Sequence, residues 1–521
     1  MGFFKCELMQ CYTIFEIHYL NQIKNPFMFK IITFIIIWIS SLFYSCIFAQ
    51  VSPKRGVAYG NHSISDLNTL KSGISWWYNW SAEPESAVNA SYESLGVEFV
   101  PMAWGKVNNP DAFIATIKPG AKYLLAFNEP NFNDGSRLTP QEAVDAWPNI
   151  EKIAAAKGLE IVSASPAYNG PSNYGGYQSP IAWHDEFFRL CPNCKVDYIA
   201  FHTYDATSNS VIGVSDGLKK YNIPIWVTEF ANRVIQSATE KTNFMKEIVT
   251  SFENDPDIYR YSWFTCRVPS DWTDMLEGQL LAANSGEIRP IGTAYLNVPY
   301  TSKKMNVPGR ITANKHYRRR GTGLQNTTDG GTSQNVCFTD EGDWGEYMIN
   351  VAKSSSYKMT FRVASLIQGK FDISVNGVIA KTDETFEATG GLQTYTDKIV
   401  SGINLPQGEN YIKIFYKSKF NFNYIDVVDE SNLGINDEIL ENSSDVFYPN
   451  PFTNEATFQI KNKTTEPLFL KIIDMKGMVC FSSNDFYTNQ KINIGHHLAS
   501  GIYTVVAVYE NTQKTFKVIK N

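Results

Sequence analysis

Two glutamates in this chain stand where buried strands are expected to end. Glu129 closes the apolar run "YLLAFNE", and Glu229 closes "IPIWVTE". Continuous apolar runs are typical of strands buried on both faces, as in parallel sheets covered by helices. If both glutamates lie at one edge of a sheet, one carboxylic acid can protonate a departing oxygen while the other carboxylate attacks. The pattern predicts the two-carboxylate chemistry of glycoside hydrolysis; the alternative is that each is an ordinary strand-end ion-pair partner.

Neighbouring side chains fit the same chemistry. Asn128, beside Glu129, can bond a sugar 2-hydroxyl at the transition state. His202 and Tyr204, in "AFHTYD", alternate so that both face one side of a strand. There they can bond the nucleophile or the sugar, although His202 is nearly as well explained as a structural histidine. Aromatic faces also stack on sugar rings, and roughly half of the aromatic residues near strand ends should be core because strand residues alternate. These residues are Trp76, Trp77, Tyr78, Trp80, Trp104 and Trp263.

Alternating strands and helices are expected to position these groups. Eight apolar runs occupy 55–60, 74–80, 97–105, 122–131, 160–168, 196–205, 223–232 and 260–267. Between the fourth and fifth runs, Thr139 as N-cap, Pro140, a capping-box Glu142 and a stop at Gly158 predict a crossover helix. Eight such units in about 240 residues match a (β/α)8 barrel, whose active sites lie at the C-terminal strand ends. We therefore predict an α/β fold with a TIM barrel at 51–298.

The rest of the chain has a different texture. Short alternating segments with Gly, Asn and Asp turns and no helical period predict a β-sandwich (jelly-roll) module at 305–430. An acidic, Ser- and Asn-containing stretch at 431–445 is typical of a linker. The final β unit, at 446–521, predicts a small C-terminal β-sandwich domain.

The N-terminal 50 residues contain a secretory leader pattern. Lys30 precedes a long apolar run, and Ala49 near its end offers a small residue for cleavage. The stretch before it is too long and mixed for a signal, so the expected true start is Met28, although the run can also remain as an anchor. In an exported protein, "CPNC" is better explained by a Cys191–Cys194 disulfide than by half a zinc site, because no second ligand pair has suitable spacing.

Charge argues against a nucleic-acid partner. The formal net charge is −6, and no long basic run is present that could follow a phosphate backbone. Aromatic residues make up 14% of the chain, which suits sugar binding as well as core packing.

Five strand motifs together resemble a known family. "ISWWYNW", "VEFVPMAWG", "LLAFNEPN", "VDYIAFHTY" and "WVTEF", in this order, are similar to glycoside hydrolase family 128, the Asl1-like glycosyl hydrolase catalytic core. The resemblance implies a clan A barrel that cleaves β-1,3-glucan with retention. It also implies that Glu129 is the acid/base and Glu229 the nucleophile. Thr203 replaces a tryptophan common in the family, which removes one aromatic group from the expected sugar floor.

The second half of the chain resembles two accessory domains. "GDWGEYMINV", "TGGLQTYTD" and "FNFNYID" are similar to a family 6 carbohydrate-binding module, which implies sugar contacts from Phe338, from Leu392 or Tyr395, and from Asn423. Leucine at 392 lacks the stacking face of the family's tryptophan. The calcium-associated acidic start of that family appears here as "ITAN" (311–314), so the resemblance supports a structural Ca²⁺ only weakly. "YPNPFTNEAT" and "LASGIYTVVAV" are similar to the type IX secretion sorting domain of Bacteroidetes; the alternative is a small immunoglobulin-like spacer.

These observations predict a secreted or cell-surface enzyme that hydrolyses β-1,3-glucan by double displacement. For that mechanism Glu129 must keep a raised pKa while Glu229 stays ionised. No cofactor or metal is expected for catalysis. The expected partners are a β-glucan and the secretion machinery, and the expected state is a monomer. The alternatives are a clan A hydrolase of another β-glycan (β-1,4, β-1,6 or xylan) and a non-catalytic glycan-binding surface protein.

Overall fold

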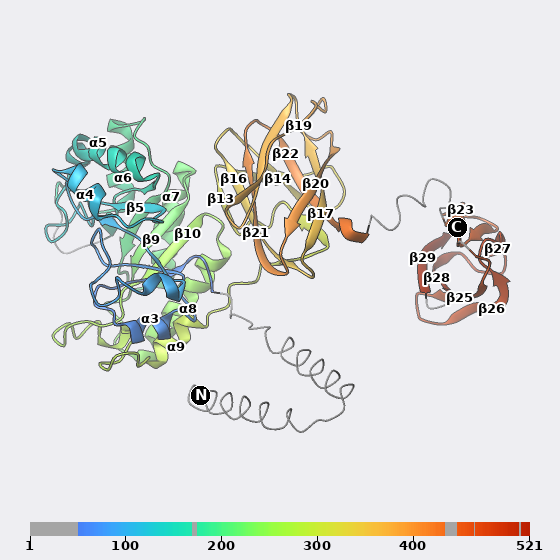
Figure 1. The fold of residues 1–521 in the computed structure, drawn as a ribbon, viewed down its shortest axis with the longest axis horizontal. Helices are drawn as coiled ribbons and strands as arrows, with labels where there is room; N and C mark the ends of the chain where they lie inside the picture. The colour runs from blue at the N-terminus through green and yellow to red at the C-terminus, as the bar shows by residue number, and fades with distance from the viewer. Residues whose placement is uncertain (1–50, 169–173, 433–444, 463, 510–511) are drawn as a thin grey trace, which may run out of the picture.

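The computed structural model describes residues 51–168, 174–432, 445–462, 464–509 and 512–521. The predicted leader and nearly all of the predicted linker lie outside these residues. Figure 1 shows an α/β region, which ends near residue 298, followed by a middle β region (305–432) and a C-terminal β region (445–521). No helix within the described part of the chain is long and apolar enough to cross a membrane.

Parallel strands form the framework of the α/β region. Among the described residues, one sheet has the order β3-β2-β1-β10-β9-β8-β7 and a second has the order β4-β5-β6. The strands are β1 (Arg55–Ala58), β2 (Trp76–Tyr78), β3 (Glu98–Phe99), β4 (Met102–Ala103), β5 (Tyr123–Ala126), β6 (Glu160–Val162), β7 (Ala167–Tyr168), β8 (Ile199–Thr203), β9 (Ile225–Phe230) and β10 (Ile258–Trp263). Every predicted apolar run contains a strand, which confirms the α/β prediction. The third and fifth runs are each split in two, because Pro101 and Pro166 have no N–H to continue the ladder.

Helices follow the strands and cover the sheets. They are α3 (Ile64–Leu70), α4 (Pro110–Thr116), α5 (Pro140–Lys157), α6 (Pro180–Leu190), α7 (Ser208–Leu218), α8 (Ala238–Asn254) and α9 (Pro290–Leu296). The predicted crossover helix is α5. Thr139 and Glu142 form its capping box, Pro140 occupies its first turn, and Gly158 ends it with a left-handed φ of 66°. The local signals at both ends of this helix therefore confirm the prediction.

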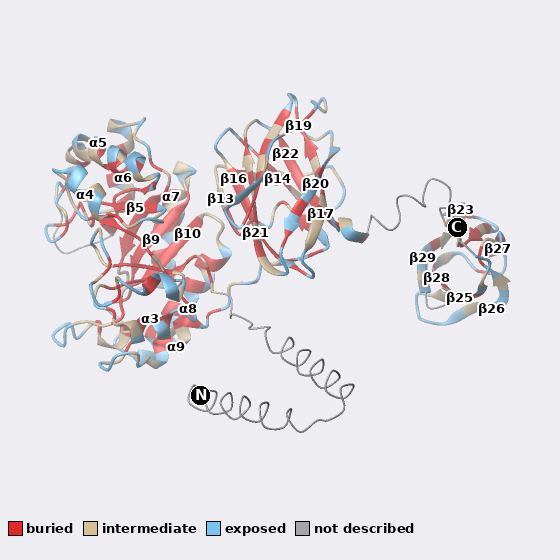
Figure 2. Ribbon diagram, viewed as in Figure 1, coloured by how far each residue is buried: buried red, intermediate tan, exposed pale blue. Residues whose placement is uncertain are grey.

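The strands of the α/β region bury side chains on both faces, as the red strands in Figure 2 show. One face packs against the helices through aliphatic and aromatic residues such as Leu67, Ile248 and Trp263. The other face carries a dense aromatic cluster that includes Trp76, Trp226 and Tyr259. Burial on both faces explains why these segments read as continuous apolar runs rather than alternating ones.

The two β-rich regions are each built from two sheets around one core. The middle region, with its core around Ile349, Phe361 and Ile412, has the sheet orders β11-β16-β21-β18-β19 and β14-β15-β22-β17-β20 in its described residues. Its strands are β11 (Met305–Val307), β12 (Gly309–Thr312), β13 (Arg318–Arg320), β14 (Gly323–Asn326), β15 (Gln334–Cys337), β16 (Trp344–Val351), β17 (Ser355–Ala364), β18 (Gly369–Val375), β19 (Val378–Phe386), β20 (Thr396–Leu405), β21 (Gly408–Tyr416) and β22 (Asn421–Asp429). The strands of the C-terminal region are β23 (Val446–Tyr448), β24 (Ala456–Gln459), β25 (Pro467–Asp474), β26 (Val479–Tyr487), β27 (Ile492–Ile494), β28 (Gly501–Tyr509) and β29 (Thr512–Lys520). Both regions match the predicted all-β texture.

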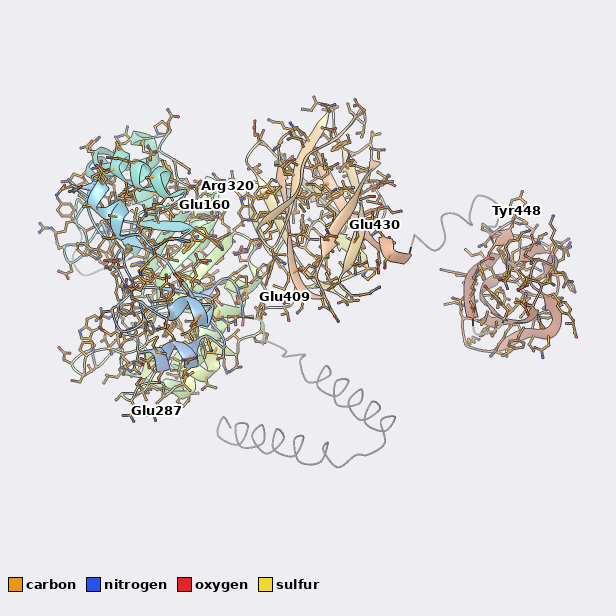
Figure 3. All side chains as sticks on the ribbon, in the orientation of Figure 1. Glu160, Glu287, Arg320, Glu409, Glu430 and Tyr448 are labelled. Carbon is orange, nitrogen blue, oxygen red and sulfur yellow. A yellow bond between two sulfur atoms is a disulfide. The ribbon has the colours of Figure 1, made fainter. Side chains whose placement is uncertain are left out.

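The middle β region packs against the N-terminal ends of the α/β strands. Arg319 makes two hydrogen bonds of 2.7 and 2.9 Å to Asp257, directly before β10. The Arg318 guanidinium lies 4.4 Å from the ring centre of Tyr259. In Figure 1, β13 and β16 face the α/β region, and Figure 3 labels Arg320 at this boundary. The C-terminal ends of the strands, where chemistry is expected, therefore remain uncovered by this region.

Candidate active site

Glu129 stands on a strained turn directly after β5. Phe127 and Glu129 have positive φ angles of 25° and 43°, a region that costs a non-glycine residue about 1–3 kcal/mol. The surrounding chain holds the turn, since Glu129 N–H donates to Ser165 O at 3.1 Å and Asn128 N–H donates to Trp104 O at 2.8 Å. A Cβ at Gly135 would lie only 2.0 Å from Glu129 O, so the return of the chain requires glycine there. On this turn the Glu129 carboxyl lies 2.9 Å from His202 Nδ1.

Glu229 lies within β9, where three donors hold its carboxylate. Tyr78 O–H and Trp80 Nε1–H each donate to Oε1 at 2.8 Å, and Tyr204 O–H donates to Oε2. The Glu229 side chain is only 4% exposed, whereas that of Glu129 is 18% exposed. An oxygen that meets an indole N–H must accept, so this arrangement favours the ionised carboxylate.

His202, on β8, lies between the two carboxyl groups. Its Nδ1 is 2.9 Å from Glu129 Oε1, and its Nε2 is 3.6 Å from Glu229 Oε1. One ligand-type atom from each of these three residues lies within 4.8 Å of the others. The predicted convergence of Glu129 and Glu229, far apart in the chain, is therefore present in the structure.

Burial and neighbouring charges together shift the pKa values of Glu229 and His202. Burial raises the pKa of Glu229 most strongly, and the Glu129 carboxylate raises it further, while His202, Tyr204 and Trp80 oppose the rise. Burial lowers the pKa of His202, but the carboxylates of Glu229 and Glu129 outweigh burial and raise it above the usual value. A protonated imidazole between two carboxylates offsets their repulsion. Glu229 thus ionises at a higher pH than a free glutamate does. The division of roles expected between the two carboxyl groups stays a prediction.

A cleft of about 870 Å³ lies over the two carboxyl groups. Asn128 lines it, and its buried Oδ1 has no hydrogen-bond partner among the described residues, so it can accept from a ligand hydroxyl. Tyr204 lines it as well, which fits the expectation that this tyrosine bonds the nucleophile. Trp104 is 43% exposed and lines the cleft, and its contact with a sugar stays a prediction. The other aromatic residues along the cleft are Trp80, Phe132, Tyr168, Phe264 and Trp272.

Three of the predicted sugar contacts lie elsewhere. Trp76 is fully buried, and its Nε1 donates to Lys54 O, because it sits at the start of β2, a strand's length below the cleft. Trp263 is fully buried against the helices, where its Nε1 donates to Gly278 O. Tyr78 is fully buried beneath Glu229, so it holds that carboxylate and does not reach a sugar. Two quantities decide these positions: the face of the strand that a residue takes and its distance along the strand from the cleft. The sequence pattern does not fix either quantity.

The cleft also contains aromatic residues that the sequence pattern does not single out. Phe264, one residue after Trp263, faces the cleft, and Trp272, on the loop that follows, is 40% exposed there. Trp80 is one of the six aromatic residues predicted near strand ends, and it alone of the six both lines the cleft and donates a hydrogen bond to Glu229. The alternation along β10 was the available signal for Phe264, but its irregular register hides which face each residue takes.

The middle β region offers mixed support for its predicted sugar contacts. Phe338 is 75% exposed and Leu392 is 42% exposed, so both are free to meet a ligand. The Tyr395 hydroxyl lies 3.3 Å from that of Thr327. Asn423 is fully buried, and its amide donates to Asp329 at 2.9 Å and to Gly330 O at 3.2 Å. The structure therefore contradicts a direct sugar contact by Asn423, because its donors hold the neighbouring loop.

The cysteine prediction is confirmed. Cys191 and Cys194 form a disulfide directly after α6. Cys266 and Cys337 are free and buried, and Cys480 is free and partly buried.

Comparisons with known proteins agree with this geometry. A model of the glycosyl hydrolase catalytic core matches residues 56–295, a family 6 carbohydrate-binding module matches 312–429, and a secretion system C-terminal sorting domain matches 446–521. The first match defines the class: the α/β region is a glycoside hydrolase catalytic core. The sorting domain indicates secretion to the cell surface or the extracellular space.

Individual relatives place the chain more narrowly. It is 34% identical to a GH128 (subgroup II) endo-β-1,3-glucanase from Sorangium cellulosum, covering 48% of this chain and 100% of that one, with a TM-score of 0.45. It is 37% identical to a GH128 (subgroup II) endo-β-1,3-glucanase from Pseudomonas viridiflava, over 48% and 100% of the two chains, with a TM-score of 0.44. On these identities the chain belongs to glycoside hydrolase family 128.

A curated relative matches over a similar length. Alkali-sensitive linkage protein 1 of Schizosaccharomyces pombe is 27% identical over 265 residues, which are 48% of this chain. The match spans 45% of that relative, so the chain covers about half of its length.

Proposed function

We propose that this protein is a secreted, retaining endo-β-1,3-glucanase with an appended glucan-binding module. The observation that carries the proposal is the close approach of Glu129 and Glu229, whose nearest ligand-type oxygens lie within 4.8 Å. Retaining glycosidases hold their carboxyl groups about 5–5.5 Å apart, whereas inverting enzymes need about 6.5–9.5 Å to admit a water. Two carboxyl oxygens within 4.8 Å of each other are compatible with the shorter of these ranges, and so with direct attack on the sugar by a carboxylate.

The surroundings of the two carboxyl groups assign their roles. Glu229, buried and held by three donors, is the nucleophile that attacks the anomeric carbon. Glu129, the more exposed of the two, protonates the departing glycosidic oxygen and then removes a proton from the water that releases the sugar. His202 contacts both carboxyl groups, at 2.9 Å from Glu129 and 3.6 Å from Glu229. These steps use only side chains and water, so catalysis requires no cofactor or metal.

The substrate class follows from the cleft and from the family. Asn128 is placed to accept a hydrogen bond from the sugar 2-hydroxyl, a contact that strengthens in the transition state of this reaction. Trp104 and Trp272 line the cleft with 43% and 40% of their surface exposed, so their rings are available to stack on glucose units. The GH128 relatives named above are endo-β-1,3-glucanases, which favours a β-1,3-glucan over cellulose, a β-1,6-glucan or xylan.

The architecture is part of the same proposal. The two parallel sheets would close into one (β/α)8 barrel, with β3 and β4 as its third strand and β6 and β7 as its fifth. An isolated parallel bridge between Val162 and Tyr198 supports this closure, because it joins the end of β6 to the approach of β8. The proposed divisions are a catalytic domain at 51–298, a carbohydrate-binding sandwich at 305–430 and a sorting domain at 446–521. We further propose a monomer, with any structural Ca²⁺ confined to the module.

Product analysis tests the proposal. The secreted protein should release oligosaccharides from laminarin and leave cellulose, β-1,6-glucan and xylan intact. Proton NMR during the first turnovers should show the β-anomer, as retention requires. Release from one of the other polysaccharides alone would reassign the substrate, and an initial α-anomer would exclude double displacement.

Substitution of the carboxylates separates an enzyme from a glycan-binding protein. Glu129→Gln and Glu229→Gln should each lower kcat on laminarin by several orders of magnitude, since each removes a group that takes part in bond cleavage. Glu142→Gln, in the capping box of α5, is the matched control and should keep the activity. Azide should rescue Glu229→Ala by forming an α-glycosyl azide. Equal sugar release by the wild type and both carboxylate variants would refute the enzymatic function.

A further inference from the structure

A buried chain of polar contacts lies beside the catalytic carboxylates. His62, after β1, donates from its backbone N–H to Glu85 Oε1 at 3.1 Å, and its Nδ1 lies 2.8 Å from the same oxygen. His62 Nε2 lies 3.7 Å from the sulfur of Cys266, after β10. The His62 side chain is fully buried and that of Glu85 is 12% exposed. A thiol, an imidazole and a carboxylate in this order have the composition of a nucleophilic triad.

The burial of Cys266 argues against a nucleophilic role. The residue is fully buried, and burial raises the pKa of its thiol, so the reactive thiolate is disfavoured. With Nδ1–H donating to Glu85, His62 Nε2 is the acceptor and the Cys266 thiol is its donor. The contacts of this group therefore point toward Glu85 rather than toward a substrate.

Glu85 collects donors from the loop that carries Trp80. Asn79 Nδ2 donates to Glu85 Oε2 at 3.0 Å, and Trp77 Nε1 approaches the same oxygen at 3.5 Å. Asn79 Oδ1 in turn accepts a hydrogen bond from Ser81 N–H at 3.1 Å, which closes a short turn around the residue between Asn79 and Ser81. That residue is Trp80, which has a positive φ of 61° and is strained for a non-glycine side chain.

We propose that Glu85 is a positioning residue for the nucleophile. It anchors Asn79, Asn79 holds Trp80 in its left-handed conformation, and the Trp80 indole then donates to Glu229. His62 orients Glu85 from the opposite side by two contacts to one oxygen. The inference rests on the proposed role of Glu229 as the nucleophile. Without Glu85, Trp80 is free to leave its strained turn, and Glu229 loses one of its donors.

Kinetics of a double-mutant cycle test this coupling. Glu85→Gln puts an amide N–H against groups that themselves donate, and Trp80→Phe removes the indole donor while keeping an aromatic ring. Each should lower kcat/KM by about 10- to 100-fold, the loss that one hydrogen bond to a charged group accounts for. The double variant should be no worse than Trp80→Phe, because Glu85 acts through Trp80. Losses that multiply would overturn the proposal.

A pH profile and a matched control variant exclude a merely structural effect. Both single variants should move the acidic limb of the kcat/KM profile to higher pH, because the Trp80 donor lowers the pKa of Glu229. Glu83→Gln is the matched control on the same loop: its side chain is exposed, only its backbone oxygen contacts Asn79, and its kinetics should stay within about twofold of wild type. A limb that stays in place in Glu85→Gln would contradict a positioning role.

An NMR experiment keeps this inference separate from the proposed function. The indole resonance of Trp80, identified by its absence in Trp80→Phe, should shift in Glu229→Gln and shift again in Glu85→Gln. This shift requires folded protein and no turnover. An inactive wild type with a shifting resonance would refute the glucanase, and with it the nucleophile, but would keep the contact by which Glu85 holds Trp80 against Glu229. An unmoved resonance in Glu85→Gln would refute that contact alone.

Discussion

Gly135 should be essential for the activity although it touches no substrate. The Cβ of Gly135→Ala would lie 2.0 Å from Glu129 O and 2.8 Å from Glu129 Cβ. Real Cβ contacts are essentially never closer than 3.0 Å, so the turn that carries Glu129 must move by about 1 Å. A displacement of that size at a catalytic group can cost about 100-fold in rate. We therefore expect kcat on laminarin to fall by about 100-fold, with KM nearly unchanged.

The control for Gly135→Ala is a second glycine near the cleft. A Cβ at Gly105 would meet its nearest neighbour, Ser136 Cβ, at an ordinary 3.6 Å, so Gly105→Ala should keep its kcat within about twofold. Circular dichroism and thermal unfolding should first show that both variants are folded. A folded Gly135→Ala variant with wild-type kcat would show that the strained turn does not position the Glu129 carboxyl.

Three further predictions concern the charge of His202, the contact between the α/β and middle β regions, and sugar binding by the middle β region. Because the folded state raises the pKa of His202, its contribution to stability is fully present below about pH 6.5 and is lost as pH rises through the raised pKa; His202→Asn should flatten that fall in urea unfolding. Arg319→Glu should lower Tm by about 2–4 °C, the effect of roughly 1 kcal/mol, and adding Asp257→Arg should restore it in calorimetry; no recovery in the double variant would refute the docking contact. Phe338→Ala should slow hydrolysis of insoluble β-1,3-glucan by about 2- to 10-fold, the worth of one aromatic contact, and leave a soluble hexasaccharide unaffected; equal losses on both substrates would contradict a separate binding site.

Much of the fold could be predicted because the helix caps and apolar runs of the sequence agree with the packing that the folded protein requires. The capping box of Thr139 and Glu142 and the stop at Gly158 placed α5 from the sequence alone. The buried parallel strands could be recognised in the sequence as continuous apolar runs. Glu129 and Glu229 could be paired because each closes such a run, and parallel strands end at a common edge. These inferences depend on order along the chain, which sequence supplies directly.

The details of the cleft depend on quantities that sequence does not supply. Trp76 and Trp80 differ in depth along one strand and its loop, and only the second reaches Glu229. Trp263 and Phe264 are neighbours that face opposite sides, and the register shift in β10 sets which one enters the cleft. Asn423 matches a sugar-binding position, yet a loop that includes Asp329 occupies its donors. Loop conformation and strand depth decided each of these cases.

The two ends of the parallel strands use their polar groups differently. At the N-terminal ends, charges such as Asp257 are paired with residues of the middle β region, so they stabilise the docking of the two regions. At the C-terminal ends, Glu129 sits on a strained backbone and Asn128 Oδ1 has no partner in the described residues. Backbone strain and an unpartnered acceptor that lines the cleft both cost stability, so together they mark a place where a ligand can contribute. Because the middle β region docks at the opposite end of the strands, it leaves the cleft over the two carboxyl groups open.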